Sequence, residues 1–157
     1  MNINEYQNYH ETKAHTSAEF PYNTYLCSIP LDFPGVPLHW HDELELVVIK
    51  RGQGFVSVDF DKRLVHSGDI IIIPPRCLHA IEQDDTFKME YENIIFKPDL
   101  LSSGANDLCM IQYIVPLLDG SLPIEYFLTP ALGSFEAIVS DRLTLSVLIR
   151  HLDGSLL

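Results

Sequence analysis

This chain of 157 residues has few basic residues and no long hydrophobic run. Ten lysines and arginines stand against 22 aspartates and glutamates, and the formal charge of −12 excludes the basic surface of a nucleic-acid reader. The first fifteen residues are polar and lack the basic start and apolar core of a secretory signal, and no stretch is long enough to span a bilayer. We therefore expect a cytoplasmic protein that contacts no membrane and, by itself, no DNA.

Cysteine is scarce as well. Cys27, Cys77 and Cys109 are odd in number and form no C-x-x-C pair, which argues against a disulfide framework and against a zinc ribbon. We interpret them as reduced, mostly buried thiols. With 46% hydrophobic residues, the chain has enough apolar material for one domain and is too short for two of ordinary size.

Short β-segments separated by turn residues occupy the chain from 22 to about 97, a pattern that predicts an all-β sandwich or barrel. A tight connection is expected at 51–54, within the glycine-containing stretch that joins two of these segments. Pro74-Pro75 ends the isoleucine run before it, because proline cannot donate to a sheet. The expected strands are 22–29, 44–50, 55–60, 63–66, 70–73, 78–83 and 86–96.

Beyond Pro98 the apolar residues recur at helical spacing. Asn106 or Asp107 can cap a helix to about Leu118, and 124–128 can form a short extended piece. A terminal helix capped by Ser134 is predicted from an apolar stripe of Phe135, Ile138, Val139, Leu145, Leu148, Ile149 and Leu152. This stripe predicts packing against the outside of the barrel, a dimer interface, or both on different faces.

Four polar residues have the chemistry of metal ligands. His39, His41 and Glu45 share parity along an extended segment and therefore point to one side of a sheet, and His79 follows in a later segment. Neutral imidazoles and one carboxylate suit Zn, Fe, Ni, Mn or Cu, and leave open positions for water or a ligand. The same residues could line a metal-free pocket for a small polar ligand, so the residues alone leave both interpretations open.

The neighbours of these four residues are predicted to have simpler roles. Trp40 has the opposite parity and is expected in the core, whereas Asp42 and Glu43 are expected at a solvated edge. Arg76 could clamp a carboxylate or phosphate of an effector, or be an ordinary surface arginine. The other histidines show no ligand spacing and are expected at the surface: His10, His15, His66 and His151.

The spacing of these residues resembles the two conserved motifs of the cupin superfamily. The first is His39-x-His41-x-x-x-Glu45 with Gly52, and the second is Gly68 with Pro74 and His79. Arg76 stands where the second motif usually has glycine. The resemblance implies a mainly β fold, the cupin double-stranded β-helix or jelly-roll barrel, with the three histidines and the glutamate at the four metal-ligating positions.

A wider segment, about 20–150, resembles the sensor domain of AraC-type bacterial transcription regulators. The similar parts are 37–45, 68–70, 74–75, 78–79, 96–98 and 114–118. The resemblance implies a cupin domain that binds a small polar effector, such as a sugar, and forms a homodimer through its helices, joined to a helix-turn-helix domain that reads DNA. The chain stops at Leu157 without that domain. We therefore expect a sensor domain cut from a longer regulator, or a regulator that has lost its DNA reader.

These arguments divide the chain into a flexible N-terminal arm (1–20), a cupin barrel (21–97) and a helical extension (98–157) for dimerisation. The effector site is predicted at His39, His41, Glu45, His79 and Arg76, without catalytic residues, and the first four are the candidate ligands of one divalent Zn, Ni, Fe or Mn ion. The main alternative is a small metal-dependent cupin enzyme, a dioxygenase or a sugar isomerase, with the same four ligands. It leaves the helical extension without a role. A plain dimeric scaffold is a third interpretation.

Overall fold

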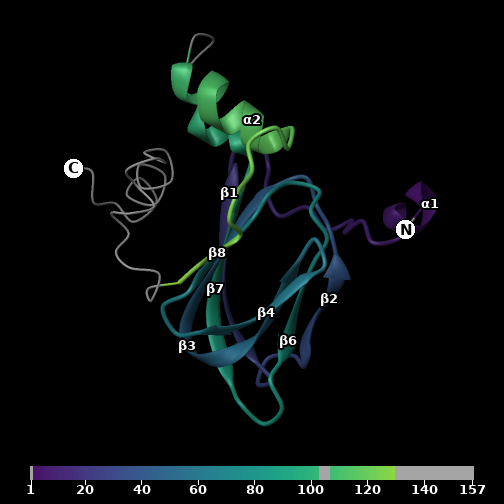
Figure 1. The fold of residues 1–157 in the computed structure, drawn as a ribbon, viewed down its shortest axis with the longest axis vertical. Helices are drawn as coiled ribbons and strands as arrows, with labels where there is room; N and C mark the ends of the chain where they lie inside the picture. Colours follow the sequence, from purple (N-terminus) through teal and green to yellow (C-terminus); the bar gives the residue numbers. More distant parts are fainter. Residues whose placement is uncertain (1, 103–106, 130–157) are drawn as a thin grey trace. The chain divides into compact units, whose positions relative to one another are not determined.

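The structure, a computed structural model, describes residues 2–102 and 107–129 and consists mainly of antiparallel strands (Figure 1). The predicted mainly β architecture is confirmed. The strands are β1 (Tyr22–Ile29), β2 (Gly35–His39), β3 (Leu44–Val58), β4 (Asp61–His66), β5 (Ile70–Ile73), β6 (His79–Gln83), β7 (Met89–Phe96) and β8 (Phe127–Leu128). The helices are α1 (Ile3–Gln7), the 3-10 turn Pro98–Leu101, the π-helical turn Met110–Ile114 and α2 (Val115–Leu118). None of the described helices is long and apolar enough to cross a membrane.

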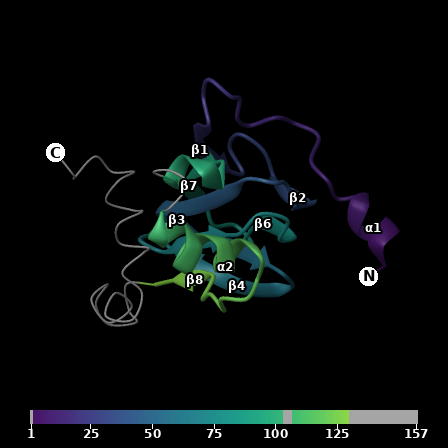
Figure 2. The same cartoon turned by 90° about the horizontal axis from the view of Figure 1, so that it is seen from above.

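The chain forms two compact units, the first made of 1–100 and 125–128 and the second of 101–124 and 129–157. In the first unit, two antiparallel sheets share the long strand β3 (Figures 1 and 2). The beginning of β3 lies in a sheet of order β1-β7-β3-β5-β8, whereas its end pairs with β4 and β6, and β6 pairs with β2. The apolar core contains the alternate side chains Val47, Ile49, Val56 and Val58 of β3.

The tight connection predicted at 51–54 is wrong, because β3 runs through this stretch without reversing. The pairing of β3 with β7 shifts in register between Ile49 and Arg51, which is the signature of a β-bulge. Gly52 follows with a φ of +76°, and a Cβ there would lie 1.8 Å from the carbonyl oxygen of Lys88. The glycine therefore bends the strand from one sheet into the other.

In the second unit, the helix predicted after Asp107 is present. The Asp107 carboxylate accepts hydrogen bonds from the backbone N–H groups of Cys109 and Met110, as the cap prediction requires. The π-helical turn precedes Pro116, which has no N–H to donate to the carbonyl of Gln112. The terminal helix predicted from Ser134 lies outside the described residues.

The three cysteines are free thiols, and their exposure differs. Cys27 and Cys77 are half-buried, as expected, whereas Cys109 is exposed on the helix of the second unit. Burial, together with the negative charge of Asp59, raises the pKa of the Cys77 thiol to about 12. Cys77 therefore stays a thiol at neutral pH and has little nucleophilic character.

Candidate ligand and metal site

Three histidines, on β2, just after β2 and on β6, form a cluster in the first unit. His39 at the end of β2 is paired directly with His79 at the start of β6, and His41 follows β2 by two residues. Their ligand nitrogens all lie within 4.8 Å of one another. His41 and His79 are almost fully buried, and the side chain of His39 is 17% exposed. The structure thus brings together the three histidines that the sequence singled out.

Glu45, near the start of β3, joins this cluster. Its Oε2 atom lies 2.9 Å from Nε2 of His41 and 3.2 Å from Nε2 of His79. Burial acts to raise the pKa of Glu45, but the contacts with His41 and His79 outweigh it and hold that pKa well below its usual range. The group is therefore a buried, ionised carboxylate held between two imidazoles.

Backbone carbonyls fix the orientation of two of the rings. The Nδ1 atom of His39 lies 2.9 Å from the carbonyl oxygen of Pro37, and Nδ1 of His79 lies 2.9 Å from that of Cys77. Because a carbonyl oxygen only accepts, these Nδ1 atoms carry the proton and donate it. In the neutral form, each of these two rings therefore presents an Nε2 lone pair to the cluster.

A cation, either a proton or a metal ion, fits the contact between His79 and Glu45. Nε2 of His79 is buried and lies 3.2 Å from Oε2 of Glu45, and with a neutral ring two acceptors would point at one another. A metal ion bound by both atoms removes the conflict, and histidine ligands in metal sites commonly donate their other N–H to a carbonyl in this way. The donor set fits a divalent transition metal.

The prediction that Glu43 lies at a solvated edge is wrong. Its side chain is 13% exposed, with Oε2 3.6 Å from Nδ1 of His41. Thr16 of the N-terminal segment donates a hydrogen bond to Oε1 of Glu43 at 3.0 Å, so this segment covers the edge. The alternation of side chains along a strand could not have indicated that Glu43 is covered, because the covering residue, Thr16, comes from a distant part of the chain.

Sequence reasoning also missed two residues of the N-terminal segment that reach the cluster. Oε2 of Glu11 lies 2.9 Å from Nε2 of His15 and 3.5 Å from Nε2 of His39. The His15 side chain is 7% exposed, and its ring centroid lies 5.6 Å from that of His41, so its predicted surface position is wrong. The spacing of four between Glu11 and His15 was the only signal in the sequence, and it did not indicate which strand they meet.

Trp40 attaches the N-terminal segment to the barrel. Its side chain is 6% exposed, as its predicted burial requires, with Tyr6 stacked at 4.8 Å and His10 at 4.2 Å between ring centroids. The indole N–H donates to the carbonyl oxygen of Tyr6 at 2.9 Å. Backbone hydrogen bonds join Trp40 to Tyr9 and Glu11 at 3.0 and 2.9 Å. The burial of Trp40 thus depends on the N-terminal segment.

Comparison with known families agrees with this geometry. The family model described as the AraC-like ligand binding domain matches residues 10–151. The chain belongs to this family.

Two HTH-type transcriptional regulators of Bacillus subtilis strain 168, both described as uncharacterized, are similar to this AraC-like domain. YdeC is 32% identical over 98 residues, which cover 62% of this chain and 34% of YdeC. YbfI is 23% identical over 106 residues, covering 68% of this chain and 38% of YbfI. The chain therefore spans little more than a third of the length of these curated relatives.

Several solved structures are similar to part of this chain. One is a cupin protein from Bacteroides fragilis, with 21% identity and a TM-score of 0.48, covering 62% of this chain and 95% of that chain. Another is a predicted oxalate decarboxylase from Thermotoga maritima, with 25% identity and a TM-score of 0.43, covering 47% of this chain and 64% of that chain.

Arg76 of this AraC-like domain lies outside the histidine cluster. Its side chain is 71% exposed and forms an ion pair with the exposed carboxylate of Asp42 at 3.2 Å. The backbone of Arg76 has a φ of +64°, in the left-handed region that favours glycine. This conformation explains why the second cupin motif, which this segment resembles, usually has glycine at the position of Arg76.

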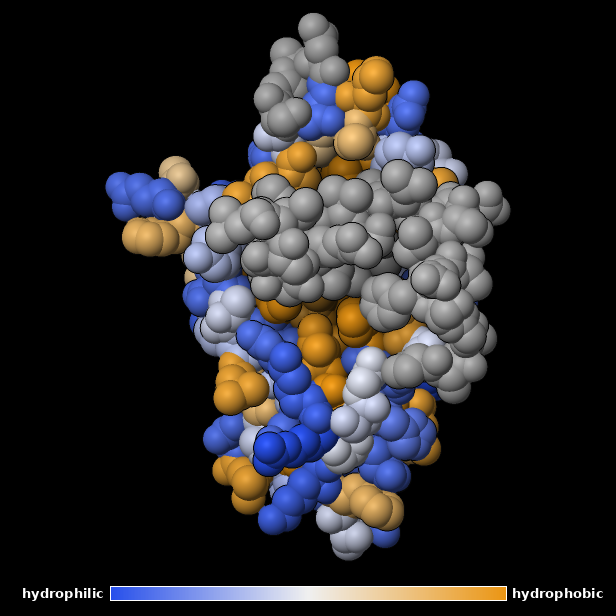
Figure 3. Space-filling model, turned by 90° about the vertical axis from the view of Figure 1, so that its left-hand side faces the viewer, coloured by the Kyte–Doolittle hydropathy of each residue, from blue (hydrophilic) through white to orange (hydrophobic). Residues whose placement is uncertain are grey.

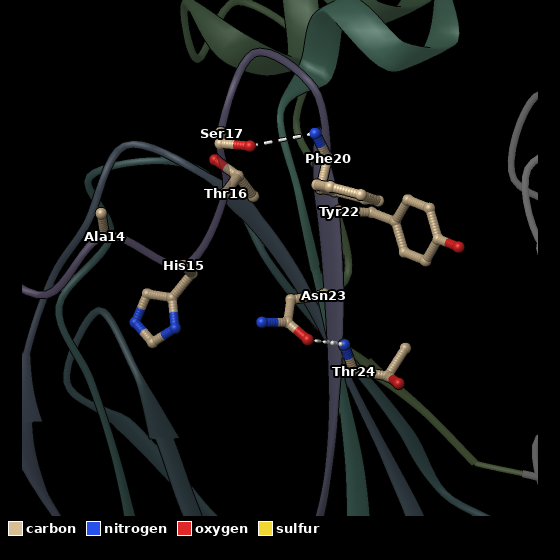
Figure 4. Close-up of a pocket in the computed structure, with 8 residues that line it drawn as sticks. All are labelled: Ala14, His15, Thr16, Ser17, Phe20, Tyr22, Asn23 and Thr24. Carbon is tan, nitrogen blue, oxygen red and sulfur yellow. Dashed lines mark hydrogen bonds between the residues drawn. The ribbon is translucent and has the colours of Figure 1, made fainter.

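A pocket of about 570 Å³ lies where the N-terminal segment of the AraC-like domain meets β1 (Figure 4). Figure 4 shows Asn23 on the same side of β1 as His15, and Tyr22 and Thr24 on the other side. Because His15 is also a neighbour of His41, the pocket adjoins the histidine cluster. The lining residues are Ala14, His15, Thr16, Ser17, Phe20, Tyr22, Asn23 and Thr24.

Proposed function

We propose that this AraC-like domain binds a small polar effector at its histidine cluster, as the sensing part of a transcription regulator. The observation that carries the proposal is the buried Glu45 carboxylate beside a His79 nitrogen that has no hydrogen-bond partner. Buried polar groups of native proteins are rarely left in this state unless a ligand or ion completes them. DNA contact belongs to a separate helix-turn-helix domain, since this chain carries a formal charge of −12.

The proposal includes one divalent transition metal, Zn, Ni, Fe or Mn, held by His39, His41, Glu45 and His79. When bound, the ion would offer open coordination positions to an oxygen atom of the effector. The protein's own part is to keep the two Nε2 lone pairs and the carboxylate oriented toward a common point through the backbone hydrogen bonds of the rings.

The proposal is tested by a thermal-shift screen of sugars, organic acids and amino acids, each with and without zinc. We expect at least one compound to raise the unfolding midpoint of the wild-type chain, and the variant His41→Ala to lose that effect. The variant His66→Ala serves as a control, because the His66 side chain is 57% exposed. If no compound binds, or if His41→Ala binds it equally well, the proposed site is wrong.

Residues 1–20 are proposed as an arm whose position depends on site occupancy. Glu11 and His15 contact the histidine cluster, while Tyr6 and His10 pack on Trp40, so effector contacts can favour one arrangement of this segment over another. Such a shift is limited by the difference in effector affinity between the two arrangements.

Deletion of residues 1–15 is expected to expose Trp40, the only tryptophan of the chain, to water. The expected result is a shift of its fluorescence emission to longer wavelength and a lower affinity for the compound found in the screen. The variant Trp40→Phe, kept at full length, shows how much of the effect depends on the stacking contact. An unchanged emission maximum together with an unchanged affinity would contradict the role of the arm.

The proposed homodimer uses the helix of the second unit. Leu108, Ile111 and Val115 are spaced along one stripe of this helix and are 65%, 56% and 46% exposed. Figure 3 shows hydrophobic residues at the surface among hydrophilic ones. We expect Ile111→Glu to convert a dimer into a monomer in sedimentation velocity, with Lys97→Glu as a control outside the stripe. A mass that stays dimeric would exclude this stripe as the interface.

A small metal-dependent cupin enzyme is the second candidate, and the complete four-residue ligand set favours it. The two candidates differ in one outcome. An enzyme converts the stabilising compound during incubation with the metal-loaded protein, and mass spectrometry detects the product. A sensor returns the compound unchanged.

A further inference from the structure

The ring of His41 is oriented differently from the other two rings of the histidine cluster. In His39 and His79, the Nδ1 atom lies 2.9 Å from a backbone carbonyl oxygen. Nδ1 of His41 is buried and has no hydrogen-bond partner in the described part of the chain. The carboxylate of Glu43 faces it, with Oε2 at 3.6 Å, just beyond hydrogen-bond distance. The orientation of His41 therefore depends on a side chain, whereas that of the other two rings depends on the backbone.

This contact becomes a donor–acceptor pair when His41 binds a metal ion. Nε2 of His41 lies 2.9 Å from Oε2 of Glu45, on the side of the proposed ion. A nitrogen bound to a metal carries no proton, so a His41 that binds through Nε2 keeps its ring proton on Nδ1, toward Glu43. A carboxylate that accepts this second N–H fixes the tautomer and the orientation of a metal-binding histidine and strengthens it as a ligand.

Glu43 is itself held by the N-terminal segment. It lies in the bend between β2 and β3, and its side chain is 13% exposed. Its Oε1 atom accepts a hydrogen bond from the Thr16 hydroxyl at 3.0 Å, which leaves Oε2 for His41. Thr16 lies 27 residues earlier in the chain, in the same segment that stacks on Trp40. A contact of the proposed arm therefore fixes which carboxylate oxygen faces the cluster.

We propose that Glu43 is a positioning residue for the metal site, and that its hydrogen bond with Thr16 makes metal affinity depend on docking of the arm. This inference rests on the proposed function. The coupling is reciprocal, because a contact that raises metal affinity in the docked arrangement also favours that arrangement once the metal is bound. Docking of the arm and binding of the ion thus stabilise each other through Thr16, Glu43 and His41.

The test measures the zinc affinity of the full chain by competition with a chromophoric chelator. Glu43→Leu removes the acceptor and is expected to weaken zinc binding about tenfold, as the loss of a residue that orients a metal ligand does. Glu43→Gln keeps an oxygen that can accept from His41 and should recover part of this loss. Asp42→Leu is the matched control and should bind zinc nearly as the wild type does, because the Asp42 carboxylate is 66% exposed and pairs with Arg76.

A double-mutant cycle separates positioning from a general effect on the fold. Thr16→Val removes the hydroxyl and keeps the branched shape of the side chain, and it is expected to weaken zinc binding about threefold, the effect of one modest hydrogen bond. In the Glu43→Leu background the same change should have no further effect, since the carboxylate is gone. Ser17→Ala is the control, because the Ser17 hydroxyl accepts from the backbone N–H of Phe20 within the arm.

The reciprocal effect is measured by trypsin cleavage after Lys13, the first lysine or arginine of the chain. Zinc is expected to slow this cleavage in the wild type and to slow it less in Thr16→Val, because the docked arm loses one of its contacts. Equal cleavage rates of the wild type with and without zinc would show that the arm and the metal site are not coupled.

Three further results would overturn the inference. Equal zinc affinity of Glu43→Leu and the wild type excludes a positioning role for Glu43, and an equal loss in Asp42→Leu means that only the charge near the site matters. An equal effect of Thr16→Val in both backgrounds means that Thr16 acts by another route. If zinc binding requires His41 but not Glu43, the proposed function stands and only the present inference fails. If the wild type binds no zinc, the metal of the proposed function is wrong as well.

Discussion

Zinc is expected to stabilise the wild-type chain against heat, and His79→Ala is expected to lose this stabilisation. The reason is the contact of Nε2 of His79 with Oε2 of Glu45 at 3.2 Å, which places an imidazole nitrogen and a carboxylate oxygen where both can bind one cation. At a free zinc concentration 100 times the dissociation constant, binding adds about 2.7 kcal/mol to stability. For a domain of this size, that raises the midpoint by roughly 5–10 °C.

Loss of His79 removes one ligand of the four and is expected to weaken zinc binding about 100-fold or more. At the same zinc concentration, the remaining stabilisation is then only about 0.4 kcal/mol. Because His79→Ala also leaves a cavity, each variant is compared with itself, with and without zinc. Elemental analysis of dialysed protein gives the bound metal independently of stability.

The control for this experiment is His66→Ala, since His66 is exposed and belongs to β4 rather than to the cluster. It should keep the full zinc effect and one equivalent of metal. Glu45→Gln, which keeps the size of the side chain but removes the charge, should behave like His79→Ala. An equal zinc shift in wild type and His79→Ala would mean that zinc binds elsewhere on the chain.

The strands and the central site residues could be predicted because they depend on local rules. β1 and β5 have the bounds that β-branched and aromatic runs indicated. His39, His41 and Glu45 do lie together, but not through parity along one strand, because His39 ends β2, His41 follows it and Glu45 belongs to β3. His79 was located by its spacing within a motif. Its direct pairing with His39 shows why that spacing matters: it sets the register in which two strands bring their imidazoles together.

The contribution of the N-terminal segment could not be predicted in the same way. Glu11 and His15 reach the cluster through a segment that meets the barrel by an isolated parallel bridge of His10 with Trp40. A single bridge leaves no periodic pattern in the sequence. The side chains that cover Glu43 and stack on Trp40 were therefore visible only in three dimensions, although Glu43 and Trp40 themselves had been singled out.

Gly52 illustrates a different limit of prediction from the sequence. Its substitution is also expected to cause the largest loss of stability. Glycine commonly marks a turn, so the sequence predicted a reversal of the chain, whereas Gly52 bends a continuous strand. Gly52→Ala is expected to destabilise the fold by about 3 kcal/mol or more, from the left-handed φ and from the contact with the carbonyl of Lys88. Chemical denaturation measures this loss.

Gly120→Ala separates these two causes. Gly120 has the same φ of +76°, but nothing lies within 4 Å of a Cβ built on it, so only the backbone conformation is penalised. Its expected cost is about 1 kcal/mol. The difference between the two losses in unfolding free energy then measures the cost of the contact between the added Cβ at position 52 and the carbonyl of Lys88. Lys88 directly precedes β7, so this contact lies where the bend of β3 packs on that part of the chain. Equal losses in both variants would show that this approach is relieved without cost, and that the bend between the two sheets does not depend on glycine's missing side chain.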